Sequence, residues 1–312
     1  MSKEQSLPKQ AEAGGSLASI VTTKLVPPRS AGKIVVRERL LAQLADVRRK
    51  RCVVLQGPAG CGKTTLAAAW RQMLLPLDFD VAWLTVTPED NDPARWLDYL
   101  LASFATVEPS LVREAAHLSG CEIDSEAVER TIISLVRSIA AHTRDVVLIL
   151  DDLHLVSNAG VRESLQFLLD YAPENLRLAL ISRSAIPLSF ARWRDRGLTI
   201  EFDLQDLRFS LSESEELLRT QLGSIERREA QLLHELTDGW VTGLQLLCID
   251  RRKNRVGDAA RERGHRRAEG RAEQGLVVLR REGIVAVEAV RVGQRAAVHE
   301  VLDAIRPALV DP

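Results

Sequence analysis

The sequence predicts an α/β fold in three layers, in which a mostly parallel sheet lies between helices and is followed by a small helical lid and an irregular basic tail. Two observations predict it. A short apolar run, Cys52–Gln56, leads into a glycine-rich loop and then into the strong helix former Leu66–Trp70, which is a strand–loop–helix order. The later run Val146–Leu150 is apolar without alternation, as in a central parallel strand buried on both faces.

The glycine-rich loop has the residue types of a phosphate-binding P-loop. The stretch is Gly57, Pro58, Ala59, Gly60, Cys61, Gly62, Lys63, Thr64 and Thr65, which fits the pattern GxxxxGK(S/T). Its glycines let the backbone turn tightly and point successive N–H groups at phosphate oxygens, and the following helix points its positive end at the same anion. Lys63 supplies a flexible charge for the β- and γ-phosphates, and the Thr64 hydroxyl can join a Mg²⁺ shell. The stretch therefore predicts the nucleotide site of a P-loop NTPase rather than a turn without a ligand.

Two carboxylates end the strand predicted at Val146–Leu150. Asp151 and Asp152 would be costly to bury there unless a cation or water meets them. In a P-loop protein this is the Walker B arrangement, in which Asp151 completes the Mg²⁺ shell and Asp152 orients or deprotonates the attacking water. An ordinary loop start is the alternative. His154 is expected to be a packed or capping imidazole rather than a catalytic one.

A third polar strand end is Ser182-Arg183, after the apolar run Leu176–Ile181. In P-loop ATPases with additional strands, a residue at this place senses the γ-phosphate. Arg183 could do so through a bidentate contact, or it could pair with Asp151 or Asp152. We favour the first interpretation, and both stay open.

Caps and periodicity predict the remaining elements. Prolines keep Lys24–Arg29 extended, and Asp92-Pro93 caps and opens a helix that runs to about Phe104. The other predicted elements are a helix from Val35 with apolar residues at Leu40, Leu41, Leu44 and Val47, strands at 81–86 and 198–202, two helices within 107–142, and a helix at 158–171 capped by Asn158.

A helical lid is predicted beyond the sheet. Ser212-Glu213-Ser214-Glu215 is interpreted as a capping box that opens a helix to about Leu222, and helices at 227–237 and 240–249 follow. The predicted organisation is therefore a disordered arm at 1–22, a P-loop ATPase domain at 23–205, a helical lid at 206–250 and an Arg-rich tail at 251–312.

Composition is ordinary for a globular protein. The 312 residues are 46% hydrophobic and 27% charged with net charge −1, which gives no sign of a membrane or nucleic-acid partner. No apolar run approaches the ~20 residues of a membrane span, and residues 1–20 lack the apolar core of a signal peptide. Cys52, Cys61, Cys121 and Cys248 have no metal-binding spacing, so we expect packed, reduced thiols and a cytoplasmic location. For Cys61 alone, an exposed and oxidisable thiol is the less favoured alternative.

Two basic segments raise the alternative of nucleic-acid binding. Arg48-Arg49-Lys50-Arg51 is interpreted instead as a solvated helix end. Between residues 251 and 275 there are nine Lys/Arg against four Asp/Glu. Three interpretations of 251–312 stay open: a disordered tail that touches nucleic acid, a weak extension of the lid with strands at 276–279 and 284–290 and a helix at 298–305, and a truncated or out-of-frame end. No helix-turn-helix is recognisable, so direct DNA binding is not expected.

Taken together, these stretches resemble the N-terminal ATPase region of MalT-like, LuxR-family transcriptional regulators, within the STAND class of P-loop ATPases. The matching residues run in order over about 22–249. They are Thr23-Lys24-Leu25, Pro27-Pro28-Arg29, Val36 to Leu40, the P-loop, Trp83-Leu84, Asp90-Asn91-Asp92, Asp151 to His154, Ser182-Arg183, Asp238-Gly239-Trp240 and Gly243-Leu244-Gln245. Two departures are visible. Thr87 stands where the family usually has an acid, and the winged-helix, helical-repeat sensor and helix-turn-helix regions of the family do not fit in this chain.

The resemblance implies a regulatory switch. ATP-bound protein with an inducer would self-associate and activate transcription, whereas ADP-bound protein would rest, and slow hydrolysis would act as a timer. It implies ATP/ADP and Mg²⁺ as cofactors, with Arg37 near the base and sugar, Lys63 and Thr64 at the phosphates and Mg²⁺, and Asp151 and Asp152 at the metal and water.

The predicted function is thus Mg²⁺-dependent ATP binding with slow hydrolysis, used as a switch. A nucleotide-binding interaction module without turnover is the alternative. A P-loop kinase or helicase is disfavoured, because no acceptor-substrate motif or second motor domain is visible.

Overall fold

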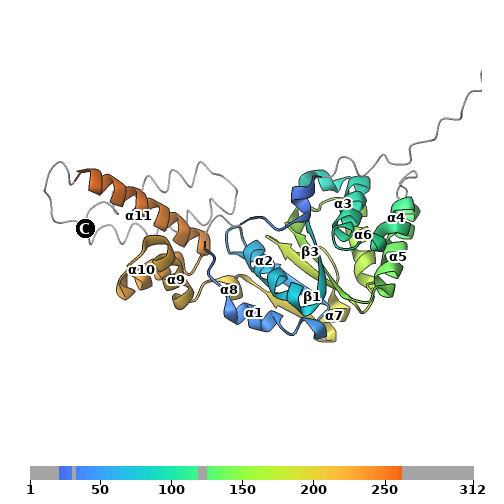
Figure 1. The fold of residues 1–312 in the computed structure, drawn as a ribbon, viewed down its shortest axis with the longest axis horizontal. Coiled ribbons are helices and arrows are strands. Elements are labelled where there is room, and N and C mark those ends of the chain that lie inside the picture. The colour runs from blue at the N-terminus through green and yellow to red at the C-terminus, as the bar shows by residue number, and fades with distance from the viewer. Residues whose placement is uncertain (1–20, 30–32, 119–124, 262–312) are drawn as a thin grey trace, which may run out of the picture. The chain divides into compact units, whose positions relative to one another are not determined.

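The computed structural model describes residues 21–29, 33–118 and 125–261. Its strands form one parallel sheet, which Figure 1 shows with β1 and β3 labelled. The order of the strands in the sheet is β2-β3-β4-β1-β5. The strands are β1 (Cys52–Gln56), β2 (Phe79–Thr85), β3 (Asp145–Asp151), β4 (Leu176–Ser182) and β5 (Thr199–Phe202). The predicted α/β class with a parallel sheet is confirmed, and each strand overlaps the apolar run that predicted it.

Helices occupy most of the remaining described chain (Figure 1). They are α1 (Glu38–Leu44), α2 (Lys63–Leu74), α3 (Pro93–Ala105), α4 (Arg113–Leu118), α5 (Ser125–Ala141), α6 (Ala159–Asp170), α7 (Ala191–Asp195), α8 (Leu204–Leu207), α9 (Leu211–Leu222), α10 (Arg227–Thr237) and α11 (Val241–Arg261). None of those in the described residues has the length and apolarity needed to cross a bilayer.

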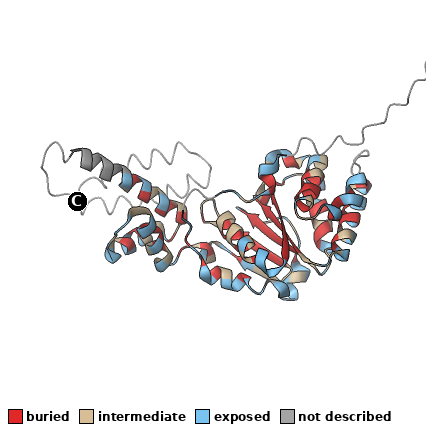
Figure 2. Ribbon diagram, viewed as in Figure 1, coloured by how far each residue is buried: buried red, intermediate tan, exposed pale blue. Residues whose placement is uncertain are grey.

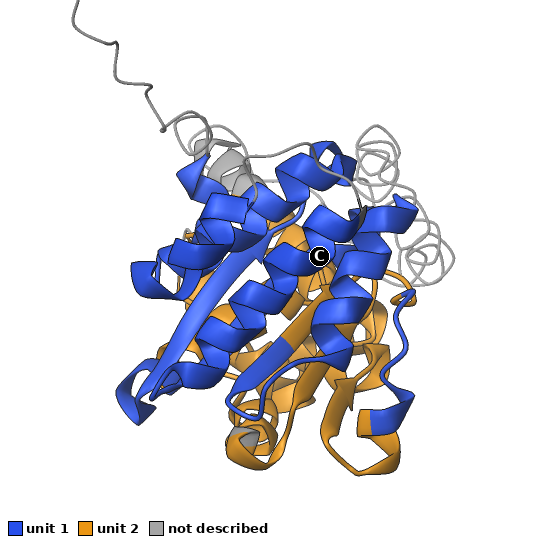
Figure 3. Ribbon diagram, turned by 90° about the vertical axis from the view of Figure 1, so that its right-hand side faces the viewer, with its two compact units in different colours: residues 1–27, 74–178, 187–192 blue, residues 28–73, 179–186, 193–312 orange. Residues whose placement is uncertain are grey.

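The chain divides into two compact units (Figure 3). The first comprises the described residues up to Pro27, residues 74–178 and residues 187–192, and it contains β2, β3 and α3 to α6. The second comprises the described residues within 28–73, 179–186 and 193–261, and it contains β1, β5, α1, α2 and α8 to α11. Strand β4 is divided between the two. The domain boundaries expected from the sequence, including the one after residue 205, stay predictions.

Strand β3 is the buried centre of the first unit. It pairs in parallel with β2, from Asp145 opposite Phe79 to Asp151 opposite Thr85. Every residue from Val146 to Asp151 is buried, as Figure 2 shows for the strands of the sheet. This burial accounts for the apolar run without alternation, because a parallel strand covered on both faces has no side facing water.

A buried ion pair fixes the start of the described chain in the first unit. Lys24 Nζ lies 2.6 Å from Oδ1 of Asp90 and 3.8 Å from the ring centroid of Tyr99. It also donates to Thr87 Oγ1 at 3.2 Å, and the Thr87 backbone N–H donates to Asp90 Oδ2 at 2.8 Å. The extended conformation predicted from Lys24 is wrong at its start, because residues Thr22–Leu25 form a 3₁₀ turn that carries the lysine to Asp90. The carboxylate of this network is thus that of Asp90, and Thr87, which stands where the family usually has an acid, hydrogen-bonds to both Lys24 and Asp90.

Helix caps largely follow the predictions. The Asp92 side chain accepts from Arg95 N at 2.8 Å and Asn158 accepts from Val161 N at 3.1 Å, so both predicted caps are confirmed. The predicted capping box of α9 is wrong by two residues. Ser210 Oγ accepts from Glu213 N at 3.2 Å, and Glu213 Oε2 accepts from Ser210 N at 2.8 Å. Both positions fit the S-x-x-E pattern, and the earlier box also brings Glu213 to Arg37.

Helix α1 is shorter than predicted. It starts at Glu38 and ends at Leu44, and a 3₁₀ turn, Val47–Arg49, follows it. Within the basic run, Lys50 Nζ donates to the Gly197 carbonyl at 2.8 Å and the Arg51 guanidinium lies 5.2 Å from the Trp193 ring centroid. These two cations therefore contact the segment before β5.

Helices α9, α10 and α11 share an apolar cluster within the second unit. Its buried members are Val35, Phe209, Leu217, Leu218, Ala230, Leu233, Val241, Leu244 and Cys248. Helix α11 continues to Arg261, so the prediction that it ends near residue 249 is wrong. The predicted arm at 1–20 and the rest of the predicted tail, 262–312, lie outside the described residues.

Candidate nucleotide-binding site

The P-loop connects β1 to α2 in the second unit. Gly60 has φ +75° and Gly62 has φ +84°, in the left-handed region that glycine adopts without strain. Gly57 N donates to the Ser182 carbonyl at 3.2 Å, which ties the loop to the end of β4. A Cβ at Gly57 would lie 3.1 Å from Cys61 Sγ. Backbone conformation thus favours glycine at positions 60 and 62, and a side chain at position 57 would be tightly packed against Cys61.

The Lys63 ammonium lies inside the curve of the loop. Its Nζ donates to the Gly57 carbonyl at 2.7 Å and to the Pro58 carbonyl at 2.8 Å, and the residue is buried. Phosphate oxygens are stronger acceptors for an ammonium than these neutral carbonyls, because both partners are then charged. The Lys63 ammonium is therefore already in position to bind an anion in the loop.

The cysteines near the loop are packed. Cys61 is 2% exposed and its thiol donates to the Pro58 carbonyl at 3.1 Å, so the alternative of an exposed Cys61 is wrong. Burial raises the pKa of the Cys52 thiol in β1 to about 12. Cys248 is also buried, whereas Cys121 lies outside the described residues. The expected packed thiols are confirmed for these three.

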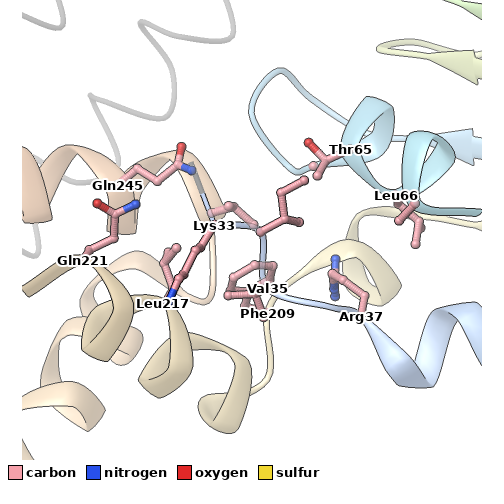
Figure 4. Close-up of a pocket in the computed structure, with 13 residues that line it drawn as sticks. Lys33, Val35, Arg37, Thr65, Leu66, Phe209, Leu217, Gln221 and Gln245 are labelled. Carbon is pink, nitrogen blue, oxygen red and sulfur yellow. The ribbon is translucent and has the colours of Figure 1, made fainter. Parts of the chain in front are cut away.

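A pocket of about 340 Å³ lies next to the P-loop, within the same unit (Figure 4). In the close-up, Thr65 and Leu66 of α2 lie on one side, Gln221 and Gln245 on the other, and Val35 and Phe209 between them. Its lining residues are Lys33, Ile34, Val35, Arg37, Gly62, Thr65, Leu66, Ala69, Phe209, Leu217, Gln221, Val241 and Gln245. A mainly apolar wall with a few polar groups and a volume in this range is typical of small-molecule sites.

Arg37 lines this pocket and is 5% exposed. Its Nη1 donates to the Leu207 carbonyl at 2.7 Å, its Nη2 to the Arg208 carbonyl at 2.6 Å, and its Nε to Glu213 Oε1 at 3.1 Å. The guanidinium also lies 4.9 Å from the ring centroid of Phe209. Arg37 therefore shapes the pocket wall, and its predicted contact with a base and sugar stays a prediction.

The predicted carboxylates belong to the first unit. Asp151 is 2% exposed and its Oδ1 accepts from the Asp152 N–H at 3.0 Å. Asp152 has φ 56°, and its Oδ1 lies 3.7 Å from His154 Nδ1. Arg183 is exposed, directly after β4 in the second unit. The pocket thus brings Arg37 together with Gly62 and Thr65 of the P-loop, Arg183 belongs to the same unit, and Asp151 and Asp152 belong to the first.

Metal binding at these residues stays a prediction. The described residues contain no group of three or more His, Cys, Asp or Glu side chains that could hold a metal ion by themselves. Such a group is not required, because Mg²⁺ usually binds one or two protein oxygens together with substrate phosphates and waters. A hydroxyl, as in Thr64, and a carboxylate, as in Asp151, are oxygen ligands of the kind that Mg²⁺ takes.

Sequence analysis did not assign several pocket and loop contacts. Phe209, Gln221 and Gln245 line the pocket, while Trp240 and Thr242 donate to P-loop carbonyls. Trp240 and Gln245 were noted only as parts of a resemblance. The signal in the sequence is the pair Asp238-Gly239, because Asp and Gly favour tight turns. Both residues adopt positive φ in the structure, shortly before α11 begins.

Comparison with protein families decides the class of the P-loop region. Residues 33–181 match the AAA ATPase domain. The P-loop region therefore has the sequence pattern of an AAA ATPase domain. The match begins at the pocket-lining segment before α1 and ends in β4, so it contains the P-loop, Asp151 and most of the sheet.

Curated relatives extend the match beyond that domain. The HTH-type transcriptional regulator MalT of Yersinia enterocolitica is 30% identical over 240 residues, 75% of this chain and 26% of the relative. The serine/threonine-protein kinase PknK of Mycobacterium tuberculosis is 33% identical over 245 residues, 77% of this chain and 22% of the relative. The chain thus spans about a quarter of the length of these relatives. The resemblance to the ATPase part of MalT-like regulators is confirmed.

Among solved structures, a Pyrococcus horikoshii STAND protein with a tetratricopeptide repeat sensor is similar at a TM-score of 0.49 and 16% identity. The similarity covers 89% of this chain and 45% of that one.

Proposed function

We propose that the chain binds ATP or ADP with Mg²⁺ and hydrolyses ATP slowly, so that the bound nucleotide acts as a switch in a regulator of transcription. One observation carries the proposal: a mainly apolar pocket continues directly from the P-loop within one compact unit. A purine would fill the pocket between Val35, Phe209 and Leu217, while its phosphates reach the P-loop.

Each predicted residue has a part in this proposal. The backbone N–H groups between Gly57 and Thr65, except at Pro58, which has none, and the Lys63 ammonium would hold the phosphates, and Thr64 and Asp151 would hold Mg²⁺. Mg²⁺ would neutralise charge that develops on the phosphates. Asp152 orients the attacking water, and Arg183 contacts the γ-phosphate.

The regulatory part of the proposal rests on the relatives. ATP-dependent self-association and response to an inducer would follow if the chain works as the ATPase part of a MalT-like regulator in the cytoplasm. The second candidate function is a nucleotide-binding interaction module without turnover. It would need only the P-loop and the pocket, which lie together in the second compact unit.

Removing the loop lysine tests the site. The Lys63→Ala variant should lose ATP binding by at least about a hundredfold, because Lys63 is the charged residue of the stretch Gly57 to Thr65 and its ammonium lies in the loop. Lys50→Ala is the matched control, because Lys50 bonds the Gly197 carbonyl instead. Both variants are titrated with Mg-ATP by calorimetry. Unchanged affinity in Lys63→Ala would remove the P-loop from the site.

A further inference from the structure

The turn before α11 and the first residues of that helix donate hydrogen bonds to the P-loop. The indole Nε1–H of Trp240 donates to the Ala59 carbonyl at 3.2 Å. The backbone N–H and the hydroxyl of Thr242 both donate to the Gly60 carbonyl, at 3.2 and 3.0 Å. All four residues belong to the second compact unit. Two consecutive carbonyl groups of the loop are therefore held from outside it.

Holding a carbonyl also sets the direction of the next N–H group. A planar trans peptide points its C=O and N–H in opposite directions, and the described residues contain no cis peptide bond. The bond to Ala59 therefore orients the N–H of Gly60, and the bonds to Gly60 orient the N–H of Cys61. These N–H groups lie in the middle of a loop type that cradles phosphate. A hydrogen bond to the carbonyl also polarises the peptide and makes its N–H a stronger donor.

Two glycines make this close contact feasible. A Cβ at Gly60 would lie 2.7 Å from Thr242 Cβ and 3.3 Å from Trp240 Nε1. A Cβ at Gly243 would lie 2.6 Å from Cε3 of Trp240 and 3.2 Å from Cγ2 of Thr237. The indole is thus packed directly over Gly243 and beside Gly60, in one defined orientation. This geometry gives a physical reason for the combination of Trp240 with Gly243 in the sequence.

We propose that Trp240 and Thr242 are positioning residues that preset the P-loop N–H groups for the phosphates of a nucleoside di- or triphosphate. Val241 lies between them and lines the pocket, so consecutive residues at the start of α11 contact both the loop and the base site. The inference rests on the proposed nucleotide site. It adds that contacts from α11 raise the affinity of the P-loop for phosphates. By thermodynamic reciprocity, bound phosphates should strengthen the contact between the P-loop and α11.

The test separates phosphate binding from base binding. Trp240→Phe removes the N–H donor and keeps a ring, and Thr242→Val removes the hydroxyl and keeps the shape. Thr237→Val is the matched control, because the Thr237 hydroxyl donates to the Leu233 carbonyl inside α10 at 2.9 Å. The full chain and the three variants are titrated with ADP and with AMP, which keeps the base and sugar but lacks the β-phosphate. Thermal melting is followed in parallel.

Each of the two variants should weaken ADP binding about three- to tenfold, the effect of one neutral hydrogen bond, and leave AMP binding within about twofold. The Thr237→Val variant should bind both ligands as the wild type does. Unchanged ADP affinity in both variants, or an equal loss for ADP and AMP, would overturn the inference. If Trp240→Phe does not fold, the ADP and AMP affinities of Thr242→Val alone test the inference, because Thr242 is only half-buried. A wild-type chain that binds neither nucleotide would overturn the proposed function itself, which is a distinguishable result.

Discussion

The Arg37 guanidinium and the Glu213 carboxylate form an ion pair, with Nε 3.1 Å from Oε1, that joins the segment before α1 to the first turn of α9. The two side chains are only 6% and 14% exposed. The same guanidinium donates to the carbonyl of Leu207, the last residue of α8, and to that of Arg208, which follows it. Arg37 thereby connects one wall of the pocket to the start of α9.

Replacing this arginine should destabilise the fold. Lysine keeps the charge but lacks the planar fork, so Arg37→Lys leaves carbonyl acceptors and Glu213 incompletely bonded. We expect the free energy of unfolding, measured in urea, to fall by about 2–4 kcal/mol. Arg39→Lys is the control, because Arg39 is exposed and donates to the Asp206 carbonyl at 2.9 Å. Its effect should stay under about 0.5 kcal/mol, and equal losses would contradict a special role for Arg37.

The Lys24–Asp90 pair gives a second stability prediction, in the first unit. Lys24→Met leaves the Asp90 carboxylate buried beside Arg95 and should lower the free energy of unfolding by about 3–5 kcal/mol. The double variant Lys24→Met/Asp90→Asn should lose less than the sum of the two single variants, because neither charge is then left buried. Urea unfolding of all four proteins measures the coupling. Additive losses would show that the two residues act independently.

Asp152→Asn should separate binding from turnover. Asparagine tolerates the left-handed backbone at φ 56°, so this change removes the charge with little strain. We expect ATP affinity within about threefold of the wild type and phosphate release slower by about a hundredfold or more. Asp78→Asn is a matched control, because Asp78 has φ 67° and an exposed side chain that pairs with Arg144. A rate of phosphate release equal to that of the wild type would show that the Asp152 carboxylate has no role in hydrolysis.

Filling the pocket should block the nucleotide without disturbing the fold. Gln245 lines the pocket and is exposed, so Gln245→Trp adds bulk at the opening. ATP affinity should fall by about tenfold or more, and the melting temperature should change by less than about 2 °C. Ile249→Trp, one turn further along α11 and outside the pocket lining, serves as the control and should bind ATP normally. Equal affinity for the two tryptophan variants would place the base elsewhere.

The strands and the P-loop were predictable because their signals are local. Val146 to Leu150 are buried on both faces, and burial leaves an unbroken apolar run in the sequence. The P-loop has glycine at positions 60 and 62, and this residue type adopts the left-handed backbone found there without strain. The strand ends and the loop therefore lay close to their predicted places.

The missed features depend on contacts between distant residues. The capping box of α9 was misplaced because two S-x-x-E patterns overlap, and the bond from Arg37 to Glu213 spans 176 residues of sequence. The bond from Trp240 to Ala59 spans 181 residues, and neither residue type signals the other. The pocket wall at Phe209 and Gln245 likewise forms only after the helices pack.

The central claim is tested most directly by titrating the purified chain with Mg-ATP while bound nucleotide and released phosphate are followed together. We predict saturable binding of one nucleotide per chain, followed by slow phosphate release that stops when Mg²⁺ is chelated. Binding without release would favour the interaction module over the hydrolytic switch. A chain that shows no saturable ATP binding would contradict the nucleotide site itself.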